Sequence, residues 1–245
     1  MLSPSAAAAP LASPTPPTLK AVLWDMDGTL VDTEPYWIAA EIALVTAHGG
    51  QWDEEKAHLL VGNALDASAR IMQEAGVKLS EREIIDHLSH EVITGIRREL
   101  PWRPGARELL ADLHNSGVRC ALVTMSERNL AAEVAQALDH DYFEFLVTGD
   151  EVTNGKPHPE PYLRAIEMLR KTDPTITAAH CAAFEDSVPG VASAMAAGVA
   201  TIAIPNAVPL AEDAGRTTWE TLAGKTADDV NAVVAAKFAA TGAAL

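Results

Sequence analysis

The stretch AVLWDMDGTLVDTE, from Ala21 to Glu34, decides the fold of this chain. Its first four residues form a short apolar run, and Asp25, Asp27 and Gly28 follow almost immediately. An apolar run of this length, bounded by turn residues, is typical of a strand buried on both faces. Carboxylates just past such a strand lie at the sheet edge where α/β folds bind ligands. The stretch therefore predicts a buried strand ending in a candidate site, although an isolated acidic cluster also suits a solvated turn.

The composition is that of a globular protein with a large acidic excess. The 245 residues are 48% hydrophobic and 21% charged, and the formal net charge is −16. Nucleic acids and anionic membranes are bound through basic patches, so we expect neither as a partner. Cys120 and Cys181 both lie in apolar runs, which predicts buried free thiols in a reducing, cytoplasmic compartment. A disulfide between them is the weaker alternative.

The first 18 residues differ from the rest of the sequence. They are rich in Ala, Pro and Ser and have neither the basic region nor the long apolar core of a secretory signal. We expect residues 1–18 to form a disordered tail. No apolar run in the sequence approaches the roughly 20 residues that a membrane-spanning helix needs.

The region after the first strand has helical periodicity without β-type alternation. Helices are predicted at 38–47, 53–60, 66–75 and 81–100, and Ser80 with Glu83 matches a capping box for the last of them. We therefore predict a helical cap domain at residues 35–101, inserted into a core domain formed by residues 19–34 and 102–245.

The rest of the chain alternates between strand and helix patterns. Further strands are predicted at 118–123, 145–147, 181–184 and 200–204, and helices at 106–115, 127–138, 160–169, 190–197 and 227–238. This alternation is typical of an α/β fold with a parallel sheet covered by helices on both faces.

Chemically active side chains follow the predicted strand ends. Thr124 and Ser126 come after the second strand, Lys156 follows the third by a loop, and Glu185 and Asp186 follow the fourth. Parallel strands end at one edge of their sheet, so these groups should converge with the two aspartates of the opening stretch. Carboxylates, a lysine and hydroxyls at a helix start suit Mg²⁺ and phosphate. One carboxylate could attack phosphorus to form an aspartyl-phosphate while another transfers protons.

Four short motifs give the chain a family resemblance. DMDGT at 25–29, TMS at 124–126, GKP at 155–157 and EDS at 185–187 resemble, in this order, the motifs of haloacid dehalogenase (HAD) superfamily phosphohydrolases with a helical cap after the first strand. The resemblance covers roughly residues 20–205. It implies a Rossmann-like core with a small inserted α-helical cap domain, and an enzyme of the phosphoric monoester hydrolase class.

The resemblance also implies a role for each motif residue. Asp25 would be the nucleophile and a Mg²⁺ ligand, and Asp27 would be the general acid/base, with its backbone carbonyl on the metal. Asp186 would complete the metal site, with Glu185 either a ligand or one layer behind. The phosphoryl group would be held by three residues: Thr124, Met125 through its backbone, and Lys156.

Three functions stay open at this point. The leading one is a Mg²⁺-dependent phosphatase of a small phosphomonoester, a sugar or polyol phosphate. The resembling subgroup also contains β-phosphoglucomutases, which usually carry a histidine where Trp37 stands and a cap arginine where Leu65 stands, so a phosphosugar mutase is the alternative. A non-catalytic phosphometabolite-binding protein is the third, although it would need no nucleophile with an adjacent acid.

Substrate contacts in the cap are harder to place. Trp37, Asn63 and Arg70 are candidates, and Trp37 suits the cap core equally well because large aromatic residues are usually well buried. We expect a small phosphorylated metabolite as the only partner, and a monomer or weak dimer.

Overall fold

A computed structural model describes residues 17–242, so the predicted tail lies outside the described residues except for its last two. The core is a six-stranded parallel sheet in the order β3-β2-β1-β4-β5-β6. Its strands are β1 (Ala21–Trp24), β2 (Arg119–Val123), β3 (Phe143–Val147), β4 (Cys181–Glu185), β5 (Ala200–Ala203) and β6 (Thr217–Thr218). The predicted α/β fold with a Rossmann-like parallel sheet is confirmed.

The predicted first strand lies at the centre of this sheet. All four residues of β1 are fully buried, and β1 pairs with β2 on one side and β4 on the other. Trp24 lies opposite Leu122 and Phe184, so the residues that follow the three strands come out at the same edge.

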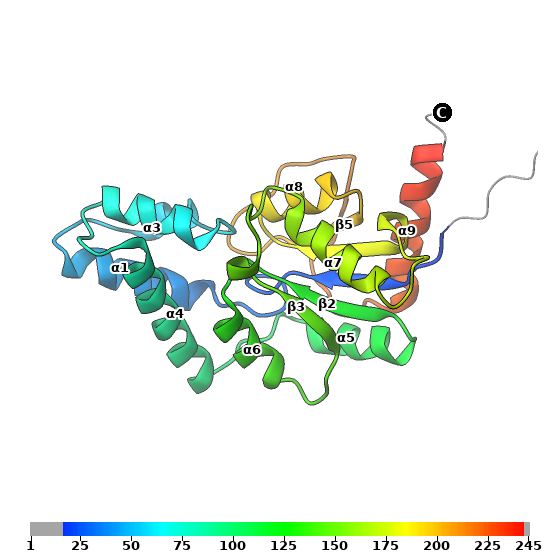
Figure 1. Ribbon diagram of the computed structural model, residues 1–245, viewed down its shortest axis with the longest axis horizontal. Coiled ribbons are helices and arrows are strands. Elements are labelled where there is room, and N and C mark those ends of the chain that lie inside the picture. Colours follow the sequence, from blue (N-terminus) through cyan, green and yellow to red (C-terminus); the bar gives the residue numbers. More distant parts are fainter. Residues whose placement is uncertain (1–16, 243–245) are drawn as a thin grey trace, which may run out of the picture.

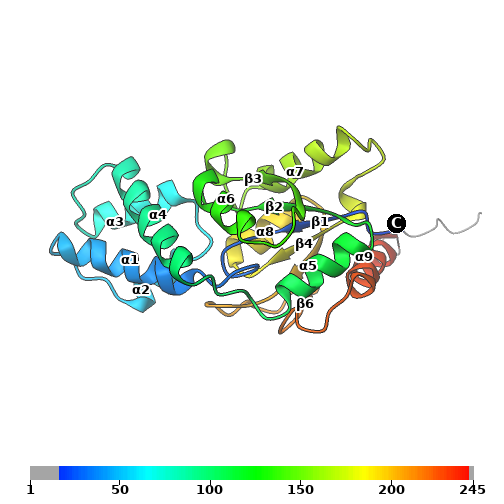
Figure 2. The same ribbon diagram turned by 90° about the horizontal axis from the view of Figure 1, so that it is seen from below.

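Helices cover both faces of the sheet (Figures 1 and 2). Val22 and Trp24 point into a core shared with α5 (Ala106–Asn115), α6 (Arg128–Gln136) and α9 (Ala227–Gly242). Ala21 and Leu23 point to the other face, which is covered by α7 (Glu160–Arg170) and α8 (Val188–Ala196). This alternation within one apolar strand follows from the two-residue period of the β-strand.

Four helices form a separate layer beyond the carboxyl ends of the strands, between β1 and α5 (Figure 1). They are α1 (Glu34–Ala47), α2 (Glu54–His58), α3 (Leu65–Glu74) and α4 (Glu81–Arg98). The capping box of Ser80 and Glu83 is present at the start of α4, as predicted. Two helices, α1 and α8, begin earlier than predicted because Pro35 and Pro189 occupy their first turns, where proline fits a helix without loss of a hydrogen bond.

Strand β6 is a strand that sequence patterns missed, and the short 3₁₀ helices Gly149–Glu151 and Ala178–His180 were not predicted either. Strand β6 has two residues, Thr217 and Thr218, and pairs with Ile202 and Ala203 of β5. A polar pair is too short to give a periodic pattern. The two cysteines are buried and free, as predicted. No helix within residues 17–242 combines the length and the apolar character needed to cross a membrane.

Candidate active site

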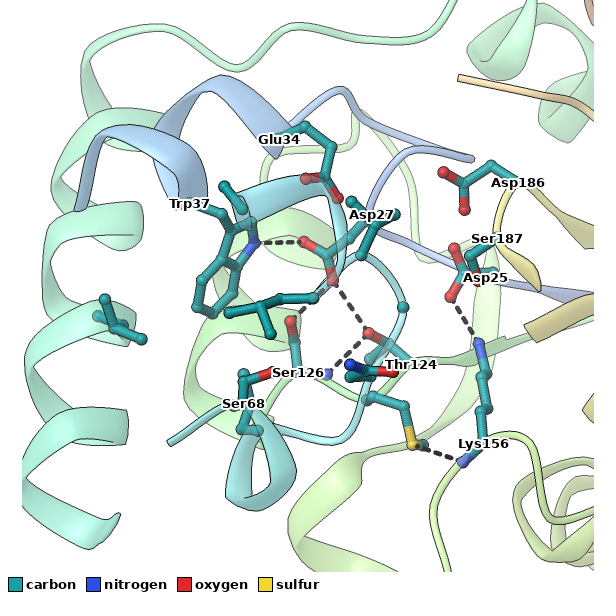
Figure 3. A pocket seen from close by; sticks show the side chains of 18 of the residues that line it. Asp25, Asp27, Glu34, Trp37, Ser68, Thr124, Ser126, Lys156, Asp186 and Ser187 are labelled. Carbon is teal, nitrogen blue, oxygen red and sulfur yellow. Dashed lines mark hydrogen bonds and ion pairs between the residues drawn. The ribbon is translucent and has the colours of Figure 1, made fainter. Parts of the chain in front are cut away.

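A small cavity of about 60 Å³ lies where the strand ends meet the four-helix layer (Figure 3). Its core side is lined by residues of the predicted motifs: Asp25, Asp27, Thr124, Met125, Lys156 and Asp186. Its other side is lined by residues of the helical layer, among them Glu34, Trp37, Glu41, Asn63 and Ser68. The parallel sheet therefore brings the predicted motif residues together, and the helical layer closes over them.

Lys156 is fixed at the floor of the cavity by three oxygen atoms. Its ammonium lies 2.6 Å from Asp25 Oδ1, 2.7 Å from Glu185 Oε1 and 2.9 Å from the Val123 carbonyl. Burial raises the pKa of Asp25 to about 7, and the charge of Lys156 opposes that rise. Burial by itself would lower the pKa of Lys156, but the charges of Asp25 and Glu185 raise it above its usual value. A permanent cation thus lies against the predicted nucleophile.

The loop that carries Lys156 is positioned by Met125. The Lys156 backbone N–H donates to Met125 Sδ at 3.2 Å, and a side chain at Gly155 would lie within 2.9 Å of the same sulfur. The third motif therefore depends on the side chain of the second for its position.

The Asp27 carboxylate accepts hydrogen bonds from four side chains. Oδ1 accepts from Thr33 Oγ1 at 2.5 Å and from Trp37 Nε1 at 3.2 Å. Oδ2 accepts from Ser126 Oγ at 2.7 Å and Thr124 Oγ1 at 3.2 Å. Thr124, which the motif resemblance assigns to phosphate, thus contacts Asp27 in this structure. Trp37 contacts it from α1, so the helical layer reaches the predicted general acid/base directly.

The carboxylates beside Asp25 fit a divalent cation. Oxygens of Asp25, Glu185 and Asp186 lie within 4.8 Å of one another. Asp25 Oδ2 and Asp186 Oδ2 are buried without a hydrogen-bond partner among the described residues. A buried, unpaired carboxylate oxygen is costly unless a cation satisfies it. An all-oxygen donor set of this charge is what Mg²⁺ prefers.

Gly28 makes this arrangement possible. It has a φ of +81°, and a side chain there would lie 2.0 Å from Asp186 Oδ2. Only glycine adopts that conformation without strain, and only glycine leaves room for the carboxylate.

Glu185 differs from the other acids of this cluster. It is fully buried, and its Oε1 accepts hydrogen bonds from both Lys156 and the Tyr162 hydroxyl. A side chain at Gly190 would lie 1.8 Å from its Oε2. Glu185 is not part of the cavity lining and lies behind Lys156.

The candidate cap residues fall in different places. Trp37 and Asn63 line the cavity. Arg70 is not among the residues that line it. Its exposed guanidinium pairs with Asp66 at 2.7 Å and with Glu81 at 3.2 Å on the surface of the helical layer. The position of Arg70 four residues after Asp66 on α3 favours this local pairing.

Sequence reasoning missed Glu34, Glu41 and Ser68. All three are buried and line the cavity. A signal existed for the two acids, because Glu34, Trp37 and Glu41 stand at positions i, i+3 and i+7 of an otherwise apolar helix. That spacing places them on one face of α1.

Comparison with known proteins agrees with the geometry. The profile of the haloacid dehalogenase-like hydrolase family matches residues 19–198. A phosphorylated carbohydrates phosphatase of Thermotoga maritima is 33% identical over 75% of this chain and 84% of its own length. Hexitol phosphatase B of Escherichia coli strain K12 is 28% identical over 78% and 86%, respectively. A crystal structure of CbbY from Rhodobacter sphaeroides, 24% identical, covers 87% of this chain and 99% of its own with a TM-score of 0.78.

Proposed function

The chain belongs to the haloacid dehalogenase-like hydrolases, and we propose that it is a Mg²⁺-dependent phosphatase that hydrolyses sugar or polyol monophosphates through an aspartyl-phosphate. The predicted family and the predicted enzyme class, a phosphoric monoester hydrolase, are confirmed. One observation carries the finer proposal. Asp25 is held at one oxygen by Lys156, and its other oxygen is buried and unpaired beside Asp186.

The chemistry divides between the two aspartates of the first motif. Asp25 attacks phosphorus, and the bond from phosphorus to the leaving oxygen breaks as the aspartyl-phosphate forms. Asp27 gives its proton to that oxygen, so the product leaves as an alcohol. Asp27 then takes a proton from water, which attacks phosphorus and releases inorganic phosphate and free Asp25. Four hydrogen bonds orient the Asp27 carboxylate for these transfers.

Charge on the phosphoryl group is balanced from two sides. Lys156 supplies a fixed cation, and Thr124 and the Met125 backbone supply polar contacts when substrate is bound. Asp25, Asp186 and the Asp27 carbonyl would hold Mg²⁺, which neutralises phosphoryl oxygens in enzymes of this chemistry. Glu185 keeps Lys156 in position through the 2.7 Å ion pair.

Residues 35–101 act in this proposal as a cap domain over a core of residues 19–34 and 102–245. A cavity of about 60 Å³ holds only a few water molecules. A phosphorylated sugar is larger, so the cap opens to admit substrate and closes to exclude water from the phosphorylated aspartate.

Two features of the cavity favour hydrolysis of a monoester over the two alternative functions. A mutase handles a sugar bisphosphate, but Lys156 is the only basic residue among the described residues that line the cavity. A binding protein needs no buried carboxylate nucleophile with a second carboxylate beside it. Hydrolysis of a monoester accounts for both features.

The test is hydrolysis of p-nitrophenyl phosphate by the full-length protein, with Mg²⁺ and then with excess EDTA. We expect EDTA to abolish activity and Asp25→Asn to lower kcat by several orders of magnitude, because an amide cannot attack phosphorus. Asp66→Asn, a change at an exposed aspartate of α3, is the matched control and should keep wild-type activity. Near-normal activity of Asp25→Asn with native circular dichroism would disprove the covalent mechanism.

A further inference from the structure

One face of α1 carries two buried acids where a packed helix normally has apolar residues. Glu34 is 8% exposed and Glu41 is 6% exposed, and Trp37 lies between them on the same face. Figure 3 shows Glu34 and Trp37 beside Asp27 at the wall of the cavity. Buried carboxyl groups lower stability unless they are paired. Their position in the cavity lining indicates that they contact what the cavity binds.

Each acid has bonding capacity left for a ligand. Glu41 Oε2 accepts from Trp52 Nε1 at 3.2 Å, and no other hydrogen bond to this carboxyl forms within residues 17–242. The Glu34 carboxyl has no hydrogen-bond partner in the same range, although it lines the cavity. A carboxylate oxygen accepts hydrogen bonds from hydroxyl groups, and both side chains have oxygens left for such bonds.

The rest of this end of the cavity is neutral. Ser68 of α3 is buried and lines the cavity with Leu60, Leu65 and Leu88. Leucine side chains suit the carbon skeleton of a small molecule, and a serine hydroxyl suits another hydroxyl. This wall therefore matches a carbon chain that carries hydroxyl groups.

Charge at the two ends of the cavity is unequal. The described lining contains five acids and one base, Lys156, which already contacts Asp25 and Glu185. A phosphoryl group at the core end meets this lysine. A second anionic group at the α1 end would face the carboxylates of Glu34 and Glu41, and like charges placed against each other repel.

We propose that Glu34 and Glu41 are specificity residues that bind the hydroxyls of an uncharged polyol or sugar leaving group and reject substrates with a second anionic group. The inference rests on the proposed phosphatase function and adds the identity of the residues that select the substrate. Trp52 is a positioning residue in this arrangement, since it orients the Glu41 carboxyl.

The experiment compares the hydrolysis of three phosphorylated compounds, two phosphoesters and one acyl phosphate, by the Mg²⁺-loaded full-length protein. Sorbitol 6-phosphate has a neutral leaving group, and 6-phosphogluconate differs from it by a carboxylate at the far end. Acetyl phosphate has no hydroxyl and reports on the core chemistry. We expect kcat/KM for sorbitol 6-phosphate to exceed that for 6-phosphogluconate on the order of 100-fold, because like charges at this wall repel.

Two substitutions at Glu41 separate hydrogen bonding from charge. Glu41→Leu removes both. It should lower kcat/KM for sorbitol 6-phosphate, relative to kcat/KM for acetyl phosphate, about tenfold, which is the effect of one lost hydrogen bond. Glu41→Gln keeps hydroxyl binding but removes the negative charge. It should therefore raise kcat/KM for 6-phosphogluconate relative to kcat/KM for sorbitol 6-phosphate. Trp52→Phe should lower the first ratio less than Glu41→Leu does. Glu74→Gln, at an exposed acid on α3, is the control and should leave both ratios as in wild type.

The outcomes separate this inference from the function on which it rests. Absence of hydrolysis of any phosphoester, p-nitrophenyl phosphate included, would overturn both. Hydrolysis of 6-phosphogluconate as efficient as that of sorbitol 6-phosphate would overturn the inference alone. A ratio unchanged by Glu41→Leu in a natively folded variant would do the same, whereas the pattern described above would establish it.

Discussion

The cavity has a core end, at Asp25 and Lys156, and a cap end, at Glu34 and Glu41 of α1. At the core end the Lys156 ammonium contacts three oxygens. At the cap end the Glu34 carboxyl has no hydrogen-bond partner within residues 17–242. The core end is complete before substrate arrives, apart from the two carboxylate oxygens suited to a cation. At the cap end, the Glu34 and Glu41 carboxyls have hydrogen-bonding capacity that the described residues do not use. This difference is what we expect from the proposed function, in which the core end carries the phosphoryl chemistry and the cap end binds the leaving group.

The largest effect should follow from removing the buried cation at the core end. Lys156→Met leaves Asp25 and Glu185 facing each other without compensation. Breaking a buried ion pair costs about 3–5 kcal/mol, and we expect a stability loss of this size together with loss of nearly all activity. Urea unfolding and p-nitrophenyl phosphate hydrolysis measure the two effects.

A surface lysine provides the matched control for that prediction. Lys20 pairs with Asp173 at 3.1 Å, but both side chains are about one-third exposed. Lys20→Met should cost less than about 1 kcal/mol because water screens exposed pairs. Similar losses in the two variants would show that the core end is not specially organised around Lys156.

The same contrast explains which part of the site could be predicted from the sequence. Asp25, Thr124, Lys156 and Asp186 were predicted to converge because parallel strands must end at one edge, whatever the side-chain details. Their spacing along the chain was therefore enough to locate the core end.

The cap end has no comparable rule. Whether Glu34 and Glu41 face the cavity depends on how α1 is rotated against the core, and only packing decides that. Arg70 illustrates the same limit. A basic residue in the cap suggested a substrate contact, but its own helix supplies Asp66, and Glu81 lies nearby. Strand β6 was missed because two threonines have no detectable period.

We expect an intermediate loss of activity from a change at Trp37, which lies where the core end and the cap end of the cavity meet. Trp37 of α1 donates its indole N–H to Asp27 Oδ1 at 3.2 Å. Trp37→Phe keeps an aromatic ring, although a smaller one, and removes this donor; one hydrogen bond to a charged group contributes about 1.5–3 kcal/mol. We expect kcat for a sugar or polyol phosphate to fall about tenfold or more, with a smaller change in KM.

A comparison of two leaving groups distinguishes a positioning role of Trp37 from a structural role. p-Nitrophenolate leaves with little need of a proton, so Trp37→Phe should affect p-nitrophenyl phosphate much less than an alkyl phosphate. Trp219→Phe, at a tryptophan packed against Phe184 away from the cavity, should affect neither. Equal losses on both substrates in the Trp37 variant would mean that Trp37 merely supports packing.

The smallest effect should come from the seam between the two ends, where α4 of the cap meets α6 of the core. Arg82 forms a two-pronged ion pair with Glu127 at 2.5 and 2.9 Å, and Arg97 forms another with Glu133. Exposed ion pairs contribute about 0–1 kcal/mol and weaken with salt. We therefore expect Arg97→Glu to raise KM less than about fivefold, and Arg97→Glu with Glu133→Arg to restore it. Arg70→Glu, whose partners lie within the cap, is the control and should leave KM unchanged.

A second measurement is the salt dependence of KM. A wild-type KM that rises between 50 and 500 mM NaCl, with a flatter response in Arg97→Glu, would link the ion pairs to the proposed cap closure. The same salt response in both proteins would mean that these ion pairs take no part in the proposed closure of the cap.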